Sequence, residues 1–235
     1  MRTSRISPKV LALSTGQSQK ELFEKYYEEF FSLLENYVLV VLDSGDIYSA
    51  RAKVIEFLID MYSVSFLEEV AFILDELGVP VTNQDIINIQ NSVDTSSFLL
   101  SNRERISSIL VTHEQNIQEL LAQGLTREEV IERYHSELTR LASSELHMGV
   151  EKASVQGAKL LEAITGTRLY KTWNCVGDSK TCPTCLAMNG VTVPVTHSFL
   201  GEDVEESIAS QLSYVGGEIT YAHPRCRCWV TYSTA

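Results

Sequence analysis

Cysteine is absent from the first 174 residues of the chain, although the 235 residues include five cysteines. The longest uninterrupted apolar run, Tyr37 to Leu42, is far too short to cross a bilayer. Residues 1–13 carry three basic side chains and little apolar sequence, so we expect a mobile arm there and no signal peptide. The sequence therefore predicts no membrane segment and synthesis in a reducing cytoplasm, where thiols seldom form disulfides.

Basic residues are also few, with 19 Lys and Arg against 31 Asp and Glu and a net charge of −12. The imbalance lies in residues 1–165, which carry 14 basic and 25 acidic side chains, whereas residues 166–235 carry 5 and 6. An acidic surface repels phosphate backbones. We therefore expect no dedicated nucleic-acid-binding site in the N-terminal part.

Helical periodicity dominates the chain up to about residue 165, with apolar residues recurring every three or four positions. The predicted helices cover residues 18–43, 47–77, 95–123 and 127–165, with a short one beginning at Thr82. Gly45, Gly124 and Gly166 mark the breaks. Thr126 and Glu129 have the spacing of a capping box, which favours a long helix from that point.

The pattern changes after Gly166 to the alternation of β-strands. The predicted strands cover residues 168–174, 191–195, 218–221 and 227–232, and a short helix is expected at 204–212. Asn189-Gly190 predicts a turn that leads into the second strand. The expected fold is mainly α with a small C-terminal α+β module. It has a helical bundle or hairpin at residues 1–124, then a region at 125–235 in which a long helix carries a few antiparallel strands.

All five cysteines gather in this C-terminal module, and four of them are spaced as metal ligands. Cys182 and Cys185 form a CPTC knuckle, and the later run HPRCRC supplies His223, Cys226 and Cys228. Thiolates and an imidazole in this arrangement suit the tetrahedral coordination of a structural Zn²⁺. Cys175 lies seven residues before the knuckle and is left out of the predicted site. By spacing alone, Cys228 could replace either His223 or Cys226.

Two other interpretations of the cysteines remain open. A redox pair at a helix N-terminus would need a βαβ context, which the flanking segments do not supply. Alternatively, the cysteines form a disulfide or pack as metal-free thiols in a small core.

The order of residues in the module resembles the C-terminal signature of the MuF-like phage head morphogenesis (minor head protein) family. The matching elements are Trp173, Asp178, Cys182-Pro-x-Cys185, Asn189-Gly190 and His223-Pro-x-Cys226-Arg227. The resemblance covers about residues 126–230. It departs from the family at 142–145, where this chain has Ala-Ser-Ser-Glu in place of a tetrad like A-R-T-E.

This resemblance implies a non-enzymatic virion protein that acts inside the capsid. A family member would associate with the portal ring and with capsid or scaffold components, would assist head morphogenesis and genome packaging or delivery, and would make at most weak contact with packaged DNA. It would be made in the host cytoplasm. The family pattern also favours Cys182, Cys185, His223 and Cys226 as the zinc ligands, with Cys228 as the reserve.

No phosphate-binding loop, nucleophile elbow or H-E-x-x-H motif indicates an enzyme. His113, His135, His147 and His197 stand apart in the sequence and are expected to be packed or on the surface. The strongest enzymatic alternative is a zinc-ribbon-like nuclease or other DNA-processing enzyme, with Asp178 as its one obvious catalytic carboxylate. A zinc-stabilised scaffold for a host partner is a third class.

Glu145 falls on the apolar stripe of the long helix, where a carboxylate is costly unless it is paired. In one interpretation the stripe rotates and Glu145 is half-exposed. In the other, Glu145 anchors the β module through Arg225, Arg227 or backbone amides.

Overall fold

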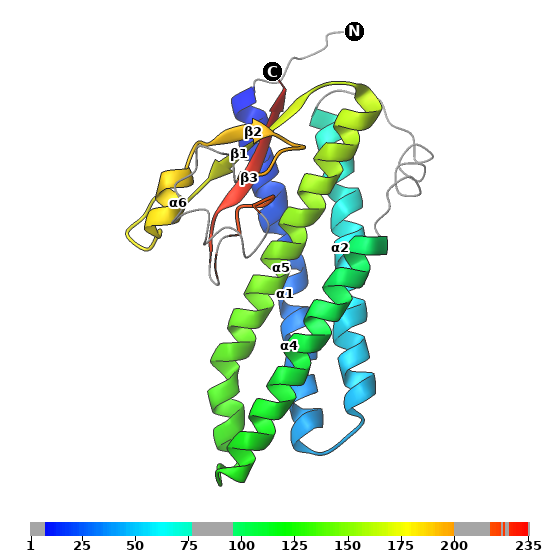
Figure 1. Ribbon diagram of the computed structural model, residues 1–235, viewed down its shortest axis with the longest axis vertical. Coiled ribbons are helices and arrows are strands. Elements are labelled where there is room, and N and C mark those ends of the chain that lie inside the picture. Colours follow the sequence, from blue (N-terminus) through cyan, green and yellow to red (C-terminus); the bar gives the residue numbers. More distant parts are fainter. Residues whose placement is uncertain (1–7, 77–95, 200–216, 222, 224–225, 235) are drawn as a thin grey trace. The chain divides into compact units, whose positions relative to one another are not determined.

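The computed structural model describes residues 8–76, 96–199, 217–221, 223 and 226–234. These residues form long helices followed by a small three-stranded antiparallel sheet (Figure 1). The predicted fold class, mainly α with a small C-terminal α+β module, is confirmed. Among the described helices, none has the length and apolar character needed to span a membrane.

The long helices match the predicted segments closely, except at the N-terminus. Their bounds are α1 Pro8–Leu42, α2 Ile47–Glu76, α4 Ser96–Ala122 and α5 Arg127–Thr165. The expected arm at residues 1–13 is wrong for residues 8–13, which belong to α1. Proline fits the first turn of a helix because its missing N–H would have no helical partner there, and Gly16 further along is tolerated inside it. The short helix predicted from Thr82 lies outside the described residues.

The predicted helix breaks follow from local backbone chemistry. Ser44 adopts a φ of 52° between α1 and α2, and Gly124 takes a φ of 89° after α4. The capping box is present, because the Thr126 N–H donates to Glu129 Oε2 at 2.7 Å and the Glu129 N–H donates to Thr126 Oγ1 at 3.3 Å. The start of α5 is therefore determined by local sequence.

The chain divides into two compact units that do not follow the predicted boundary at residues 124 and 125, which stays a prediction. The helical unit comprises Glu24–Tyr62 and Asp94–Leu146, and the mixed unit comprises Met1–Phe23, Ser63–Val93 and His147–Ala235. Helices α1, α2 and α5 each contribute one part to either unit.

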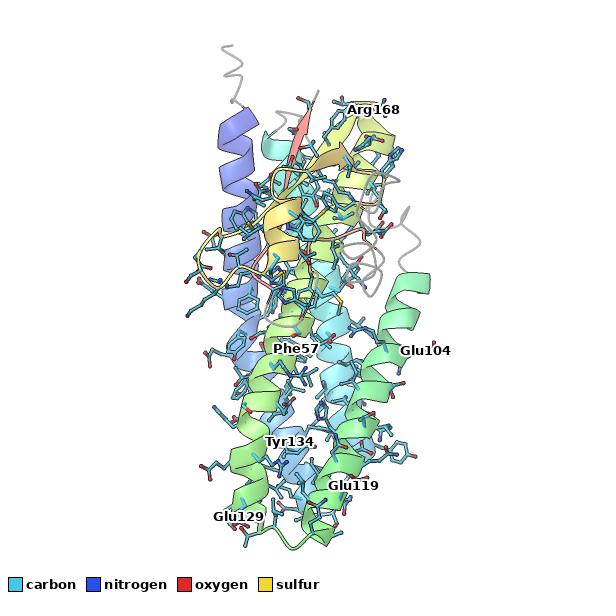
Figure 2. The ribbon with its side chains drawn as sticks, turned by 60° about the vertical axis from the view of Figure 1, so that its left-hand side comes forward. Phe57, Glu104, Glu119, Glu129, Tyr134 and Arg168 are labelled. Atoms are coloured by element: carbon cyan, nitrogen blue, oxygen red, sulfur yellow. The ribbon has the colours of Figure 1, made fainter. Side chains whose placement is uncertain are left out.

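Apolar side chains from four helices fill the core of the helical unit. They include Phe30, Leu34, Val54, Ile106, Leu110, Ile117, Val130 and Leu138. Tyr134 on α5 donates its hydroxyl to the His113 carbonyl at 3.2 Å, whereas Glu104, Glu119 and Glu129 are exposed (Figure 2). The expected separation of an apolar interior from an acidic exterior is therefore present.

A partly buried polar network links α1, α2 and α4 in the same unit. The Tyr37 hydroxyl donates to the Leu110 carbonyl at 2.9 Å and to the Glu114 carboxylate, and Arg51 Nη2 donates to Glu114 Oε2 at 2.8 Å. Burial, together with Glu114, raises the pKa of Tyr37 well above its ordinary value. Tyr37 therefore remains a neutral donor at physiological pH.

The sheet of the mixed unit has the strand order β2-β1-β3. Its strands are β1 Leu169–Asn174, β2 Thr192–Pro194 and β3 Trp229–Thr234, and helix α6 Pro183–Met188 lies between the first two. Gly190, at a φ of 85°, donates its N–H to the Trp173 carbonyl at 2.8 Å, so the predicted turn does lead into β2. The strand predicted at 218–221 is wrong, and the helix predicted at 204–212 lies outside the described residues.

The inward face of β1 carries a lysine between two apolar residues. Leu169, Lys171 and Trp173 alternate on this buried face, and Lys171 is 0% exposed. Its Nζ donates to the Glu218 carbonyl at 2.7 Å and lies 4.8 Å from the centre of the Phe199 ring. Burial, with a smaller contribution from Lys159, lowers the pKa of Lys171 to about 8.

Helices α2 and α5 approach closely within the mixed unit at Gly157. A Cβ at this position would lie 3.0 Å from Val70 Cγ2 and 3.9 Å from the Phe66 carbonyl oxygen. A Cβ here would require Val70 to shift by a few tenths of an ångström, so glycine suits this close contact.

Candidate metal centre

Five metal-binding side chains meet in the mixed unit, and they form two overlapping groups of three. The outer triad is Cys182, Cys185 and His223, and the inner triad is Cys185, Cys226 and Cys228. Within each triad the donor atoms lie within 4.8 Å of one another. We call the five residues together the Cys/His cluster.

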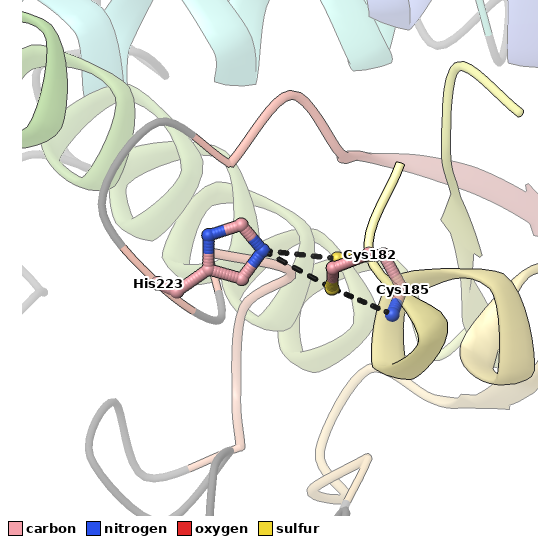
Figure 3. A group of neighbouring side chains, drawn as sticks. All are labelled: Cys182, Cys185 and His223. Carbon is pink, nitrogen blue, oxygen red and sulfur yellow. Dashed lines mark hydrogen bonds between the residues drawn. The ribbon is translucent and has the colours of Figure 1, made fainter. Parts of the chain in front are cut away.

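The outer triad is built by the first turn of α6 and by His223 facing it (Figure 3). Pro183 begins the helix, and Cys182 caps it by accepting the Cys185 N–H on its Sγ at 3.3 Å. This cap directs both sulfurs to one side, where His223 Nε2 lies 3.2 Å from the Cys182 sulfur and 3.6 Å from the Cys185 sulfur. A proline-started turn thus places two thiols and an imidazole together.

The inner triad joins α6 to the segment that precedes β3. The Sγ atoms of Cys185 and Cys226 are 3.8 Å apart, and all three thiols of the triad are buried. Cys226 also donates its thiol to the Thr220 carbonyl at 3.4 Å. None of the five cysteines, which all lie among the described residues, forms a disulfide.

The separations of Cys185 from Cys226 and from His223 match those around a tetrahedral zinc ion, whereas Cys182 Sγ and His223 Nε2, 3.2 Å apart, are closer than such an ion would hold them. Bond lengths of about 2.3 Å to sulfur and 2.0–2.1 Å to nitrogen place two sulfurs about 3.8 Å apart and a sulfur and a nitrogen about 3.6 Å apart. The Cys185–Cys226 and Cys185–His223 separations are 3.8 and 3.6 Å. Soft thiolates and an imidazole are also the donors that zinc prefers. The Cys/His cluster can therefore bind a metal ion.

Without a bound cation, crowding and burial keep the Cys185 and Cys228 thiols protonated. Hydrogen bonding with Cys226 and Cys228, followed by burial, raises the pKa of Cys185 far above that of an ordinary thiol. Burial opposes ionisation of Cys182, but the Cys185 amide and His223 outweigh it, so the pKa of Cys182 is lowered. Hydrogen bonding from Cys185 lowers the pKa of Cys228, but the neighbouring Cys226 and burial raise it by more. Several crowded thiolates become favourable together only beside a compensating positive charge.

An exposed ion pair connects the turn before Cys182 to the segment that contains Cys226 and Cys228. Arg227 donates to both carboxylate oxygens of Asp178, at 2.8 and 2.6 Å. Asp178 also accepts the Lys180 N–H at 3.0 Å and the Thr181 hydroxyl at 3.1 Å, which shapes the turn before Cys182. Arg227, followed by these local donors, lowers the pKa of Asp178 far below that of an ordinary carboxyl. The one carboxylate considered for a nuclease thus has both oxygens occupied by an arginine.

Glu151 on α5 positions the segment that leads to His223, and sequence reasoning missed it. Its carboxylate is 1% exposed and accepts the N–H groups of Thr220 and Tyr221, both at 3.0 Å, and the Thr220 hydroxyl. Because these amides face a carboxylate, they are not available to a neighbouring strand, which explains why 218–221 is not a strand. The spacing that marked Glu145 would have found it, since Met148, Glu151 and Val155 continue the same stripe.

His147, one turn before Glu151, holds the other end of this segment. Its Nε2–H donates to the Cys228 carbonyl at 2.8 Å, and Glu151 Oε1 lies 3.6 Å from the same nitrogen. Burial would lower the pKa of His147, but the Glu151 carboxylate outweighs it and raises this pKa. His147 and Glu151 therefore support the segment that carries the candidate metal ligands from one face of α5, a role that the isolated histidine in the sequence did not reveal.

Glu145 is not half-exposed, and its partner among the described residues is Arg105 rather than the β module, while the predicted partner Arg225 lies outside the described residues. The side chain is buried, and both of its carboxylate oxygens accept hydrogen bonds from Arg105 of α4, Nη1–Oε1 being 2.8 Å. Glu145 and Arg105 both belong to the helical unit. The link to backbone amides that was predicted for Glu145 is made by Glu151 instead.

The predicted ligands Cys182, Cys185, His223 and Cys226 all lie in the Cys/His cluster, but they do not form one group of four. Cys226 joins Cys185 and the reserve ligand Cys228, so the choice among ligand sets stays a prediction. Cys175 belongs to neither triad, and its N–H donates to Asn189 Oδ1 at 2.9 Å. Strands β1 and β2 on either side of the CPTC turn are antiparallel, unlike the βαβ context of a redox pair.

No family model, no curated protein and no solved structure matches this chain.

Proposed function

We propose that this protein is a minor head component of a tailed bacteriophage, associated with the portal ring inside the capsid. There it would assist head morphogenesis and genome packaging or delivery as a structural protein. The observation that carries the proposal is that the separated elements of the signature interact within one small module. Trp173 is fully buried in β1, Asp178 pairs with Arg227, Gly190 closes the turn before β2, and the Cys and His residues form the cluster.

These contacts support the proposal because short motifs that match by chance have no reason to meet in space. Asp178 and Arg227 are 49 residues apart and form a bidentate pair. Cys185 and His223 are 38 residues apart and share the outer triad. The residues that carry the resemblance therefore contact one another within a single structural module.

We further propose that the Cys/His cluster binds one structural zinc ion. The donor types and the Cys185–His223 and Cys185–Cys226 separations support zinc. The ion would connect α6 to the segment before β3, since the two triads join these elements. Because the described residues of this module form three short strands, such a link would supply much of its stability.

The acidic helical unit is proposed as the part that contacts other virion proteins. It carries 17 acidic and 8 basic residues, a net charge of −9 out of the −12 of the chain. Such a surface disfavours DNA and favours a protein partner with a basic face. We expect the portal ring, with capsid or scaffold components, to provide this face.

Purification of particles from the phage or prophage that encodes this chain would test the proposal. Mass spectrometry should find the protein in heads that contain portal, in fewer copies than the major capsid subunit. Heads assembled without portal should lack it. Its exclusion from portal-containing heads would contradict the proposal.

A plasmid-cleavage assay addresses the enzymatic alternative. The purified protein should leave DNA intact with and without added divalent metal. His223→Ala and His197→Ala form a matched pair, because both replace a histidine but only His223 belongs to the cluster. Metal-dependent cleavage that His223→Ala abolishes and His197→Ala retains would favour a nuclease.

A further inference from the structure

The Cys/His cluster offers five donors, one more than a structural zinc ion takes. The five donors differ in burial. Cys185, Cys226 and Cys228 are 2%, 4% and 2% exposed, whereas Cys182 and His223 are half-buried. Cys182 and His223 also lie closest to each other, with 3.2 Å between Sγ and Nε2.

We infer that Cys185, Cys226 and Cys228 hold the ion throughout, and that Cys182 and His223 alternate as its fourth ligand. This inference rests on the zinc site proposed above and concerns how that site is used. It differs from the ligand set expected from the family pattern, in which Cys182 and His223 both bind and Cys228 is a reserve.

Hydrogen bonds that lead to α5 hold two residues of the inner triad, Cys226 and Cys228, in place. The Cys226 thiol bonds to the Thr220 carbonyl, and the Cys228 carbonyl accepts from His147 of α5. Thr220 is in turn held by Glu151. The two cysteines that precede β3 are therefore attached to one long helix, independently of any metal ion.

Cys182 and His223 compete for a single coordination position of the ion. An ion bound by the three inner thiolates has one tetrahedral position left. Cys182 and His223 both lie beside Cys185 but share no triad with Cys226 or Cys228, so whichever of them binds must move toward these two thiols. Binding both of them at once would require five ligands, so one replaces the other.

An exchangeable ligand on the less buried side gives the ion a reactive vertex. An incoming thiolate or imidazole can take this position while three protein thiolates retain the ion. The chemical class of ligand that fits is therefore a cysteine or histidine side chain of a partner, or a small thiol.

Zinc titration of the full chain against a competing chelator tests the inference. The variants are Cys182→Ser, His223→Ala, their double variant and Cys228→Ser. Each outer single variant should keep one zinc per chain, with Kd raised by less than about tenfold. The double variant and Cys228→Ser should each raise Kd by at least about 100-fold. If either outer single variant matches the loss in the double variant, or if Cys228→Ser has no effect, the inference is overturned.

Alkylation of the wild-type protein provides a second measurement, which does not depend on whether Cys228→Ser folds. With the zinc-loaded chain and iodoacetamide, native mass spectrometry should show one modification, at Cys182, with zinc retained because His223 takes the vertex. Release of zinc in step with Cys182 modification, or modification of Cys228, would overturn the inference and leave the zinc site standing. A wild-type chain that binds no zinc would instead refute the zinc site itself.

Discussion

Each of the two units buries a glutamate on α5, and the two are stabilised by different partners. In the helical unit, Glu145 is paired with the guanidinium of Arg105. In the mixed unit, Glu151 accepts two backbone amides and a hydroxyl. The first is a charge pair between two helices, whereas the second orders an irregular segment next to metal-binding residues.

The difference shows what each unit needs from a buried charge. The helical unit has regular helices whose amides are already bonded, so a buried carboxylate there requires a cation. Among the described residues no strand pairs with the segment around Thr220, and a carboxylate accepts its amides. Breaking the Arg105–Glu145 pair should therefore destabilise the helical unit, whereas changing Glu151 should loosen the segment around Thr220.

Metal removal should have the largest effect and should separate the units most clearly. Chelation, or Cys185→Ser, should unfold the metal-binding part of the mixed unit, because structural zinc contributes on the order of 10–16 kcal/mol of apparent binding free energy. The near-UV circular dichroism of Trp173 and Trp229 should disappear while most far-UV helicity remains. Cys175→Ser is the matched control, since Cys175 lies in neither triad. Metal-free protein with intact tryptophan signals would contradict this expectation.

Arg105→Met should destabilise the helical unit by about 2–3 kcal/mol, because it leaves the Glu145 carboxylate buried without its cation. The value is set at the low end since the Arg105 side chain is 33% exposed. Urea unfolding should show the loss, and the double variant Arg105→Met with Glu145→Leu should recover most of it. Arg127→Met, which removes an exposed pair with Asp43, should change little. A double variant no more stable than Arg105→Met would argue against a charge-burial effect.

Glu151→Gln should loosen the mixed unit by about 1–3 kcal/mol, since an amide replaces one of its two acceptor oxygens with a donor. Hydrogen exchange should accelerate around Thr220 and Tyr221, and zinc affinity should fall by about 10–100-fold as for a supporting residue of a metal site. Glu145→Gln is the control, and it should change neither hydrogen exchange at residues 217–230 nor the zinc affinity. Equal effects of the two variants on zinc affinity would remove the distinction between the glutamates.

Lys171 should produce the smallest effect, visible as a pH dependence of the mixed unit. Its pKa is lowered to about 8 in the folded protein from 10.5, so between these values the unfolded chain binds more protons. The free energy of unfolding therefore rises as the pH increases from about 8 toward 10.5. Well below pH 8, Lys171 is protonated in both states and adds no pH dependence. The gain from pH 7 to 9.5 should be about 1–2 kcal/mol relative to Lys171→Met. Parallel stability curves for the two proteins would show that Lys171 does not titrate in this range.

Sequence alone determined the elements whose signals are local. The capping box at Thr126 and Glu129, the breaks at Ser44 and Gly124, and the turn at Asn189-Gly190 each involve neighbouring residues, so periodicity and turn chemistry placed them within a few positions. The start of α1 was placed too late, because the basic residues and scarce apolar sequence of residues 1–13 predict an arm, whereas proline fits the first turn of a helix. The clustering of Cys182, Cys185, His223, Cys226 and Cys228 was also foreseen, because their spacing is itself a metal-binding pattern.

Only the tertiary structure decided which side chains satisfy one another across long separations. Glu145 and Glu151 look equivalent on the stripe of α5, yet one meets Arg105 and the other meets Thr220, because the identity of a buried partner depends on packing rather than on spacing along one helix. The same reason explains the strand wrongly predicted at 218–221, whose amides were taken by Glu151. It also explains why five donors foreseen from sequence form two triads that share Cys185, an arrangement that depends on where α6 meets the segment before β3.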